Sequence, residues 1–353
     1  MKIKVMHVAE ILKGGVSTVI CAASNLNEVD SVLYGPVAHR EYVSLFQGET
    51  YYYERSGRNI LSLIRFFFGF IKVYNQVKPD VIHLHSSLSI LVSCYIWLAS
   101  LFNGAQCKVI YQPHGISYDM DMPQSKTKEG VFKIFERFFS VFVNSIIAIS
   151  KYEMAQIQKL HRGKLVHLLY NGVKAPVNEL STSDREGYLF VGRFNHQKGV
   201  DLLIDCWEKN SFRDTLHIVG EPVDCVFDCV IPANVKLHGW VDQETLDGYY
   251  SKCKALIVPS RWEGFGLIVA EAFRNRTPVI VSDRGALPEI VDDGIDGYVF
   301  SLDAIQTALG TKLEMLNEAN QSNRMGESGF RKYSDMFSQE IFLKNLLAIY
   351  ALN

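Results

Sequence analysis

Two basic residues, Arg193 and Lys198, flank a short segment that begins after Gly192 and ends before Gly199. The residues before this segment have the apolar pattern of a strand, and those after it have the pattern of a helix. A helix start offers free backbone N–H groups and the positive end of its dipole, so two added cations there suit a diphosphate. The spacing alone leaves a pair of solvated surface cations as the alternative.

Two carboxylates, Glu263 and Glu271, enclose a second glycine-rich segment. The turn Gly264-Phe265-Gly266 precedes an apolar helix that starts near Leu267 and carries Glu271. Glycines at such a turn let a ligand approach the backbone amides. One carboxylate at the turn and one on the helix could therefore accept hydrogen bonds from hydroxyl groups in two parts of one ligand. A helix-dipole partner and a solvated helix residue are the structural alternatives.

Glycines and histidines also follow strands that the first half of the sequence predicts. Gly14 and Gly15 follow the first of these strands, His114 follows another, and His85 ends a third. Ligands of parallel sheets bind at the carboxyl ends of the strands, and this place favours a role in the site for His114. For His85, contact with a ligand is the weaker hypothesis beside a role in the core.

Strands alternate with helices along the whole chain, a pattern that predicts two successive α/β domains with doubly wound parallel sheets. Strands are predicted at Ile3–Val8, Val81–Leu84, Lys108–Gln112, Ser145–Ile149 and Leu165–Leu169, and then at Tyr188–Val191, Thr215–Val219, Val235–His238, Ala255–Val258 and Pro278–Val281. We expect a first domain over residues 1–173, a polar linker over 174–186, a second domain over 187–333 and a C-terminal helix over 334–353. The strand ends of the two domains are expected to face each other across a cleft.

Length and composition agree with this organisation. The chain has 353 residues, of which 48% are hydrophobic and 21% charged, the balance of a globular protein with sizeable cores. Its formal charge of −2 hides an asymmetry, because residues 1–173 carry 18 Lys and Arg against 12 Asp and Glu, and residues 174–353 carry 18 against 26. A basic half joined to an acidic half indicates that one domain faces something anionic. Disordered and disulfide-scaffold classes are excluded.

Cysteines and apolar segments bear on the compartment. The seven cysteines form no metal-site pattern and are expected to be reduced thiols. Residues 86–107 carry no charge, but their strongly apolar part is shorter than the roughly 20 residues that a membrane span needs. Residues 60–71 could form a core helix, which we favour, or an interfacial helix that places aromatic rings in lipid. The N-terminal residues indicate a strand rather than a signal peptide.

These motifs together resemble the family-4 glycosyltransferases of the GT-B architecture, including the type that builds bacterial surface polysaccharides and lipopolysaccharides. The resemblance extends over nearly the whole chain. It rests on Gly14-Gly15, Gln112-Pro-His-Gly115, Tyr170-Asn-Gly-Val173, Gly192-Arg193 with Lys198-Gly199, Glu263-x7-Glu271, Thr277-Pro-Val279, Ser282-Asp283 and Pro288-Glu-Ile-Val291.

The resemblance implies a retaining, metal-independent transferase that uses a nucleotide-diphosphate sugar as co-substrate and has no cofactor. Arg193 and Lys198 would hold the pyrophosphate and stabilise the leaving group. Glu271 would bind the ribose and Glu263 the sugar hydroxyls, while His114 would contact the sugar near its anomeric carbon. The other donor-binding positions would be Gly15, Gly220, Gly264, Phe265, Gly266 and Leu267, and Gly14 and His85 could touch the acceptor.

The sequence departs from the family's pattern in two places, and it also contains one motif of a different architecture. Where the family commonly ends a helix with glycine, this chain has Arg276, and Asn275 is predicted to take the left-handed conformation instead. Glu221 follows Gly220 where a second glycine is common, which leaves the nucleotide base open, UDP being the family's most frequent carrier. Asp119 and Asp121 match a metal signature of another glycosyltransferase architecture, and we interpret this tripeptide as a coincidence.

The family's usual setting predicts a hexose or N-acetylhexosamine transferred to a glycan acceptor, linked to a polyprenyl-diphosphate lipid, in O-antigen or capsule synthesis. We expect a cytoplasmic protein bound peripherally to the inner face of the membrane, with no nucleic-acid partner. Basic residues available to anionic lipid are Lys126, Lys128, Lys133, Lys159, Arg162 and Lys164. A sugar-nucleotide epimerase and a catalytically silent sugar-nucleotide-binding scaffold are the alternatives.

Overall fold

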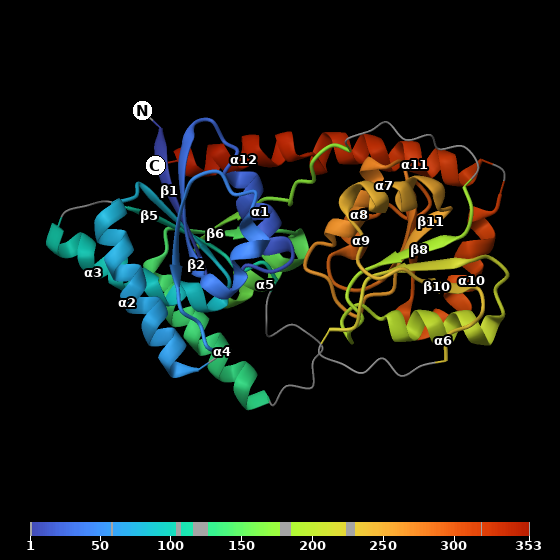
Figure 1. Cartoon of the computed structure of the whole chain (residues 1–353), viewed down its shortest axis with the longest axis horizontal. Helices are drawn as coiled ribbons and strands as arrows, with labels where there is room; N and C mark the ends of the chain where they lie inside the picture. The colour runs from blue at the N-terminus through green and yellow to red at the C-terminus, as the bar shows by residue number, and fades with distance from the viewer. Residues whose placement is uncertain are drawn as a thin grey trace. The chain divides into compact units, whose positions relative to one another are not determined.

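The computed structural model describes residues 2–57, 59–103, 107–115, 126–176, 185–223, 230–318 and 320–352, apart from the side chains of 103 and 126–129. The chain divides into two compact units (Figure 1). Unit 1 comprises Met1–Asn171 together with Phe342–Asn353, and unit 2 comprises Gly172–Ile341. The end of the chain therefore belongs to the same unit as its beginning. Asp119, Asp121 and most of the linker predicted over 174–186 lie outside the described residues.

Unit 1 is built on a parallel sheet of seven strands in the order β3-β2-β1-β4-β5-β6-β7. The strands are β1 Ile3–Ala9, β2 Val29–Pro36, β3 Glu49–Tyr53, β4 Val81–His85, β5 Lys108–Gln112, β6 Ser145–Ala148 and β7 Leu165–Leu168. Two of them, β2 and β3, were not among the predicted strands. Because β1 lies between β2 and β4, the strand order reverses at β1 and β4, and loops that leave these strands diverge there.

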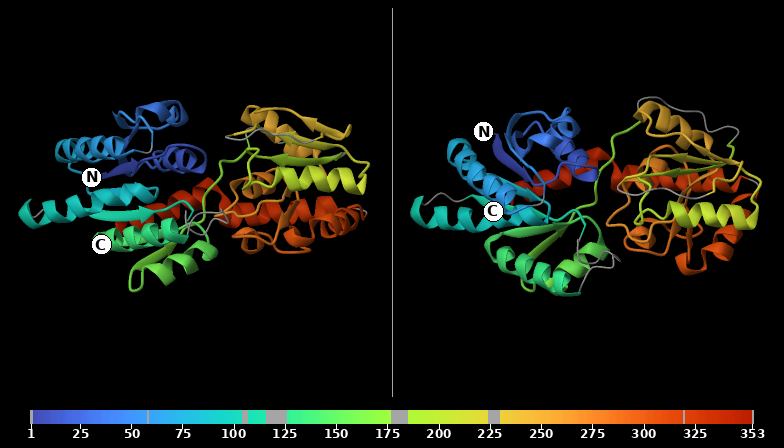
Figure 2. Two further views of the ribbon diagram at one scale, coloured as in Figure 1. Left: turned by 90° about the horizontal axis from the view of Figure 1, so that it is seen from below. Right: turned by 60° about the horizontal axis from the view of Figure 1, so that its bottom comes forward.

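Helices cover both faces of this sheet (Figures 1 and 2). Along one face pack α1 (Gly15–Ala23) and the C-terminal helix α12 (Gln339–Ala351), which buries Phe342 and Leu346. The other face is covered by α2 (Ile60–Val77), α3 (Ser93–Asn103), α4 (Lys126–Phe139) and α5 (Lys151–Leu160). The short helices of this unit are η1 Val37–Val43, η2 Ser87–Val92 and η3 Ser140–Phe142. Within the uncharged stretch 86–107, the described residues thus form η2 and α3 rather than one helix.

Unit 2 has a parallel sheet of six strands in the order β10-β9-β8-β11-β12-β13. The strands are β8 Tyr188–Val191, β9 Leu216–Val219, β10 Val235–Leu237, β11 Ala255–Val258, β12 Val279–Ser282 and β13 Gly297–Phe300, the last of which was not predicted. The helices are α6 Val200–Asn210, α7 Gln243–Lys252, α8 Leu267–Arg274, α9 Leu287–Ile290, η4 Leu302–Ala304, α10 Ile305–Leu316, α11 Gln321–Lys332 and the π-helical η5 Tyr333–Phe337. The strand order reverses between β8 and β11, so the loops after these two strands are the expected ligand loops.

The helix end after α8 corrects one prediction. Asn275 has a φ of −95°, whereas Arg276 has a φ of 55° and is itself the left-handed residue. The Arg276 guanidinium lies 3.8 Å from the centre of the Phe330 ring and forms an ion pair with Glu327. These contacts with α11 offset part of the cost of a left-handed backbone at a residue with a side chain. The prediction for Asn275 was therefore wrong.

Candidate functional site

The loop after β8 carries the first predicted cations of unit 2. Arg193 is exposed, and the guanidinium donates one long hydrogen bond of 3.4 Å to the Gln197 side chain. Lys198 comes directly before Gly199, the N-cap of α6, and its own backbone N–H donates to the Asn195 side chain at 3.1 Å. The N-cap of α6 is a glycine and has no side chain to cap the helix, but the Asp201 carboxylate in the first turn accepts from the backbone N–H groups of Asp201 and Leu202. Two cations thus lie together at this helix start, as the diphosphate hypothesis requires.

Glu263 lies on the loop after β11, on the other side of the point where the strand order reverses. Its carboxylate is nearly buried and forms an ion pair with the Lys198 ammonium group. The Ser260 hydroxyl donates to the same carboxylate oxygen at 2.9 Å. Neighbouring strands therefore bring together two predicted site residues, one from the glycine-rich segment and one from the cationic segment. Charge-assisted hydrogen bonds of this kind hold a polar group in one geometry.

Glu271 lies on α8 and accepts a hydrogen bond of 3.1 Å from the Tyr250 hydroxyl. Burial raises the pKa of Glu271, while the nearby Arg274 and the Tyr250 hydrogen bond lower it. Arg274 is itself buried in an ion pair with Asp247, and its guanidinium also donates to the Lys174 backbone carbonyl at 2.7 Å. Glu271 is thus a partly desolvated carboxylate in a fixed position, with lone pairs suited to ligand hydroxyls.

The turn between Glu263 and α8 has the backbone that its glycines predict. Gly266 is the left-handed N-cap of α8, with a φ of 90° and no side-chain cap. Phe265 is buried against Phe337, whose ring centre is 5.6 Å away. Gly264 and Leu267 are half-buried. The turn is therefore anchored by an aromatic side chain and leaves backbone N–H groups at the start of α8 without a side-chain cap among the described residues.

Two further glycines set the distances between these loops. Gly220 follows β9 with a φ of 140°, and a Cβ there would lie 1.9 Å from the Gly192 carbonyl oxygen. Gly285 has a φ of 60°, and a Cβ would lie 2.3 Å from the Glu263 carbonyl oxygen. The next residue, Ala286, donates its backbone N–H to that same oxygen at 2.9 Å. Sequence reasoning found Gly220 but missed Gly285, because only the tertiary structure places it against Glu263.

In unit 1 the predicted glycines and histidines lie at the carboxyl ends of their strands. Gly14, with a φ of 63°, is the N-cap of α1, and Gly15 is the first residue of that helix. His114 follows β5 with a φ of 59°, a left-handed backbone that is costly for a residue with a side chain. Its Nε2 atom lies 2.7 Å from Nδ1 of His85. These two histidines therefore contact each other.

Sequence reasoning missed Glu153, which supports the loop after His114. Glu153 is buried on α5, and its carboxylate accepts backbone N–H groups from Gly115 and Ile149, each at 2.7 Å. Burial raises its pKa to about 7 despite these hydrogen bonds. Ser150 caps α5, because its hydroxyl accepts the Glu153 N–H at 3.0 Å. A serine followed three residues later by glutamate was the available signal.

The side chains of His7, His83 and His85 could offer nitrogen atoms within 4.8 Å of one another. The rings of His83 and His85 have centroids 4.0 Å apart and planes 36° apart, so they lie tilted against each other. Nδ1 of His7 and Nε2 of His85 are 3.0 Å apart, the distance of a hydrogen bond. This hydrogen bond connects two of the three rings.

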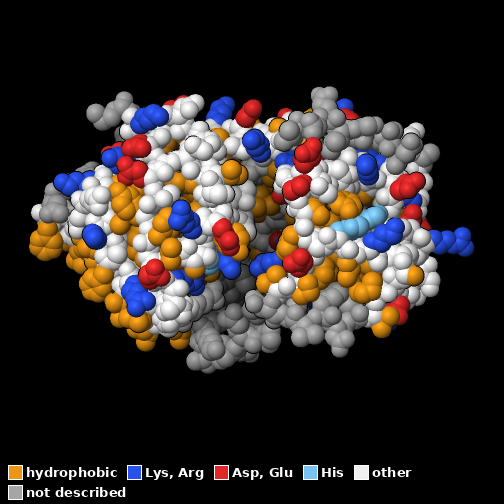
Figure 3. Space-filling view, in the orientation of Figure 1, with side chains coloured by type: hydrophobic (Ala, Val, Ile, Leu, Met, Phe, Trp, Pro, Cys, Tyr) orange, Lys and Arg blue, Asp and Glu red, His pale blue; other side chains and the backbone are white. Residues whose placement is uncertain are grey.

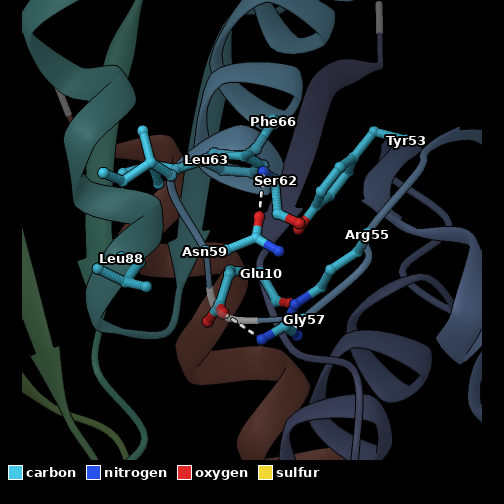
Figure 4. Close-up of a pocket in the computed structure, with 10 residues that line it drawn as sticks. Glu10, Tyr53, Arg55, Gly57, Asn59, Ser62, Leu63, Phe66 and Leu88 are labelled. Atoms are coloured by element: carbon cyan, nitrogen blue, oxygen red, sulfur yellow. Dashed lines mark hydrogen bonds and ion pairs between the residues drawn. The ribbon is translucent and has the colours of Figure 1, made fainter.

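A pocket of about 280 Å³ in unit 1 was not predicted (Figure 4). It lies where β1, β3 and η2 meet the start of α2, and its walls include Tyr53, Leu63 and Phe66. Figure 4 shows Arg55 pointing toward Glu10, and these side chains form an ion pair at 2.6 Å. The pocket therefore combines apolar walls with one charged pair, beside the strand reversal of unit 1.

An exposed apolar surface covers the outer sides of the helices α2, α3 and α4 (Figure 3). Its members are Ile60, Leu61, Ile64, Phe68, Trp97, Leu98, Leu101, Phe102, Val131, Ile134, Phe138 and Val141. Figure 3 shows hydrophobic side chains gathered over α2 and α3. Among the described residues, α2 is the one helix long and apolar enough to span a membrane, by length and composition only. Phe66, Phe70 and Val73 tie its other side into the core.

Comparisons with known proteins agree with this geometry. The family model described as Glycosyltransferase Family 4 matches residues 17–175, and the model described as Glycosyl transferases group 1 matches residues 175–332. An uncharacterized 41.2 kDa protein in the cps region of Klebsiella pneumoniae is 33% identical, with 96% of this chain and 98% of that protein covered. The O-antigen chain mannosyltransferase C of Escherichia coli is 23% identical over 67% of this chain and 68% of that protein.

Solved structures show the same fold at lower identity. Sucrose-phosphate synthase from Thermosynechococcus elongatus superposes with a TM-score of 0.81 at 18% identity, covering 99% of this chain and 98% of that one. Anabaena HepE, solved in complex with UDP-glucose, gives a TM-score of 0.78 at 16% identity and covers 98% of each chain. The chain therefore belongs to the family-4 glycosyltransferases and has the GT-B fold of two parallel-sheet α/β domains.

Proposed function

We propose that this glycosyltransferase moves a hexose or N-acetylhexosamine from a nucleotide-diphosphate sugar, with UDP as the first carrier to test, to a hydroxyl group of a glycan acceptor. The observation that carries the proposal is the pair of cations Arg193 and Lys198 at the start of α6, beside the Glu263 carboxylate. Two cations suit a diphosphate, and a fixed carboxylate suits sugar hydroxyls. The UDP-glucose bound to Anabaena HepE supports this choice of donor.

Each residue then has a part in the reaction. Arg193 and Lys198 bind the diphosphate and stabilise the charge that it gains as the bond to the sugar breaks. Glu271 accepts hydrogen bonds from the ribose hydroxyls, and Glu263 accepts them from the sugar while it holds Lys198. Gly15, Gly220, Gly264 and Gly266 let the donor approach the backbone, and Leu267 offers the first backbone N–H of α8. His114 contacts the sugar near its anomeric carbon.

The proposed chemistry retains the configuration of the sugar and requires no bound metal and no cofactor. The acceptor oxygen forms a bond to the anomeric carbon on the face that the diphosphate leaves. The carbon–oxygen bond to the diphosphate breaks, and a phosphate oxygen takes the proton of the acceptor hydroxyl. Stabilising the leaving group in this way is the main task of Arg193 and Lys198.

We place this transfer in bacterial surface-polysaccharide synthesis, on an acceptor linked to a polyprenyl diphosphate, at the inner face of the cytoplasmic membrane. The relative from the Klebsiella cps region and the O-antigen mannosyltransferase support this setting. The exposed apolar surface on α2, α3 and α4 supports peripheral attachment, because soluble proteins rarely expose so large an apolar area without a partner. Arg65, Lys72 and Arg137 add exposed cations to these helices.

The acceptor would reach the pocket of unit 1 from this surface. Ile60 and Leu63 belong to α2, so the pocket opens beside the N-terminal end of the exposed surface. Replacing Leu63 with Trp should fill the pocket and raise the acceptor KM while the donor KM stays unchanged. The matched control is Leu98→Trp, on the exposed surface but outside the pocket. Equal acceptor KM values for both variants would rule the pocket out as the acceptor site.

Membrane attachment has its own test, sedimentation with vesicles. Vesicles that contain anionic lipid should sediment the protein at low salt, and added salt should weaken but not abolish binding, because apolar insertion is not screened. A double variant, Ile64→Ser with Phe68→Ser, should lose the part of vesicle binding that resists added salt. Failure of the wild-type protein to sediment at low salt refutes the membrane proposal.

One assay tests the function itself. The protein is incubated with labelled nucleotide sugars and a lipid extract from a polysaccharide-producing bacterium. Transfer of label to lipid supports the proposal. Isomerisation of the donor supports an epimerase instead, and donor binding without turnover across all donors supports a silent scaffold. Chelation of divalent ions should leave transfer intact.

A further inference from the structure

A row of buried polar side chains lies on one face of the unit 1 sheet, at the carboxyl ends of β1, β4 and β5. His7 pairs with His83 across neighbouring strands, and His85 pairs with Gln112. Alternate residues of a strand point to the same face, so His83 and His85 share it. The preceding residues on that face, Val5, Val81 and Ile110, are apolar core. The polar row therefore replaces the core only where the strands end.

His7 and His85 of this row form a continuous hydrogen-bonded chain with His114, which follows β5. Nδ1 of His7 lies 3.0 Å from Nε2 of His85, and Nδ1 of His85 lies 2.7 Å from Nε2 of His114. His85 thus uses both ring nitrogens, one toward the core and one toward His114. His83 stands outside this chain, because its Nδ1 lies 2.8 Å from the Tyr350 hydroxyl on α12.

His7, His85 and His114 are all held in the neutral form. Burial lowers the pKa of His7 to about 3 and that of His114 to about 3. The pKa of His85 is also lowered, first by burial and then by the neighbouring histidines His83, His114 and His7. A neutral imidazole carries one proton, so one of its nitrogens donates and the other accepts. Two directions of donation along the chain are therefore open.

The His7 end of this row of hydrogen-bonded histidines decides between the two directions of donation. Nε2 of His7 is buried and has no hydrogen-bond partner among the described residues. If protons pointed from His114 toward His7, this nitrogen would carry an unpaired buried N–H. If they point the other way, it carries only an unused lone pair. Unpaired buried donors are the rarer and costlier defect, so donation from His7 through His85 to His114 is favoured.

We infer that His85 is a positioning residue which holds His114 as the tautomer protonated on Nδ1, so that His114 serves the transfer as a neutral hydrogen-bond donor and not as a general base. The inference rests on the proposed function, since it assigns a chemical form to a residue of that site. His114 Nε2 is occupied by His85, and Nδ1–H is the ring group left to meet an oxygen of the sugar or the departing phosphate. The left-handed backbone of His114 is kept in place by the same contact and by Glu153 on the following residue.

The tautomer can be measured without any assay of transfer. Nitrogen-15 spectra of the imidazole rings, with His114 assigned by its loss in His114→Gln, should show a protonated Nδ1 and an unprotonated Nε2 at neutral pH. A protonated Nε2 on His114, or a doubly protonated ring, would overturn the inference. This measurement stays valid even if the donor or acceptor proposed above is wrong.

Two substitutions of His85 separate positioning from general loss of packing. An asparagine amide occupies the place of Nδ1 and a glutamine amide that of Nε2, so His85→Asn keeps a partner for His114 and His85→Gln keeps only the contact toward His7. We expect kcat to fall about tenfold or more in His85→Gln and to stay within about threefold of wild type in His85→Asn, with the donor KM unchanged in both. Equal loss of kcat in the two variants would refute positioning by His85.

Tyr350→Phe is the matched control, because it removes a buried hydroxyl that contacts His83 of the polar row but none of His7, His85 and His114. It should leave kcat unchanged, and thermal unfolding of all variants should show intact folding. If His114→Ala itself retains full kcat while the nitrogen-15 spectra show the expected tautomer, the catalytic role proposed for His114 fails and the tautomer assignment stands.

Discussion

Lys198 and Glu263 form an ion pair within unit 2 although 65 residues separate them in the sequence. Their side chains are 16% and 7% exposed, so both charges are largely removed from water. The Ser260 hydroxyl completes the hydrogen bonding of the same carboxylate oxygen. The pair joins the loop that offers cations to the loop that offers a carboxylate, and under the proposed function it would tie diphosphate binding to sugar binding.

Breaking this pair should cost more than removing a surface cation. In Lys198→Ala the Glu263 carboxylate stays buried without its partner, so we expect donor affinity to fall about 100-fold and kcat to fall further. Calorimetric titration with UDP and the steady-state kcat measure the two effects. Lys209→Ala, which breaks an exposed pair with Asp205 on α6, is the control and should change neither. Wild-type affinity in Lys198→Ala would contradict the assignment.

The pH dependence of donor binding should report Glu271. Burial raises the pKa of this carboxyl group, so protonation begins at a higher pH than for an ordinary glutamate and weakens the hydrogen bonds that it is proposed to accept from the ribose. The donor KM should thus rise as the pH falls through that raised pKa. Tyr250→Phe removes a hydrogen bond that favours the ionised form and should move the rise to still higher pH.

The control for this shift is Tyr249→Phe, since the Tyr249 hydroxyl contacts His238 at 2.9 Å and not Glu271. The donor KM is measured across pH 4 to 8 for the three proteins. A profile that is the same in Tyr250→Phe and wild type would show that Glu271 does not control it.

Gly285 should prove necessary for placing Glu263. In Gly285→Ala the new methyl group would meet the Glu263 backbone oxygen at 2.3 Å and its nitrogen at 2.8 Å, so the loop after β11 must move. We expect the donor KM to rise about tenfold or more. Gly294→Ala has a similar backbone, with a φ of 83°, but meets no atom within 4 Å. Gly294→Ala should therefore lose only the stability that a left-handed alanine costs. An equal donor KM in Gly285→Ala and Gly294→Ala would contradict the role of Gly285.

Glu136 should make stability depend on pH. It is buried on α4, where it accepts from the Tyr111 hydroxyl at 2.9 Å, and burial raises its pKa from 4.5 to about 7. The unfolded chain releases this proton first, so the free energy of unfolding should fall as the pH rises from about 4.5 to about 7 and level off above it. Glu136→Gln keeps an acceptor for Tyr111 and should remove the part of this decline that Glu136 contributes, roughly 3 kcal/mol, while the part from Glu153, whose pKa burial also raises to about 7, remains. Urea unfolding at several pH values measures it, and exposed Glu41→Gln should behave as wild type.

The alternation of strands and helices could be predicted from the sequence because buried parallel strands are short apolar runs that end at glycines. The strands β2, β3 and β13 escaped prediction, in β3 because Glu49–Tyr53 is polar and aromatic rather than aliphatic. The left-handed residue after α8 was assigned to Asn275 by type, but packing of Arg276 on Phe330 placed it one residue later. Local preference is a weak guide where a tertiary contact outweighs it.

By itself the sequence determined the candidate site segments, since residue type, glycine positions and strand ends are local properties. Arg193, Lys198, Glu263, Glu271 and His114 were all found in this way. Only the tertiary structure decided which of them meet, because a contact between distant residues depends on strand order and register. The partner of Lys198, the loop contact of Gly285 and the histidine chain behind His114 all arise at strand ends that neighbour one another in a sheet and lie far apart in sequence.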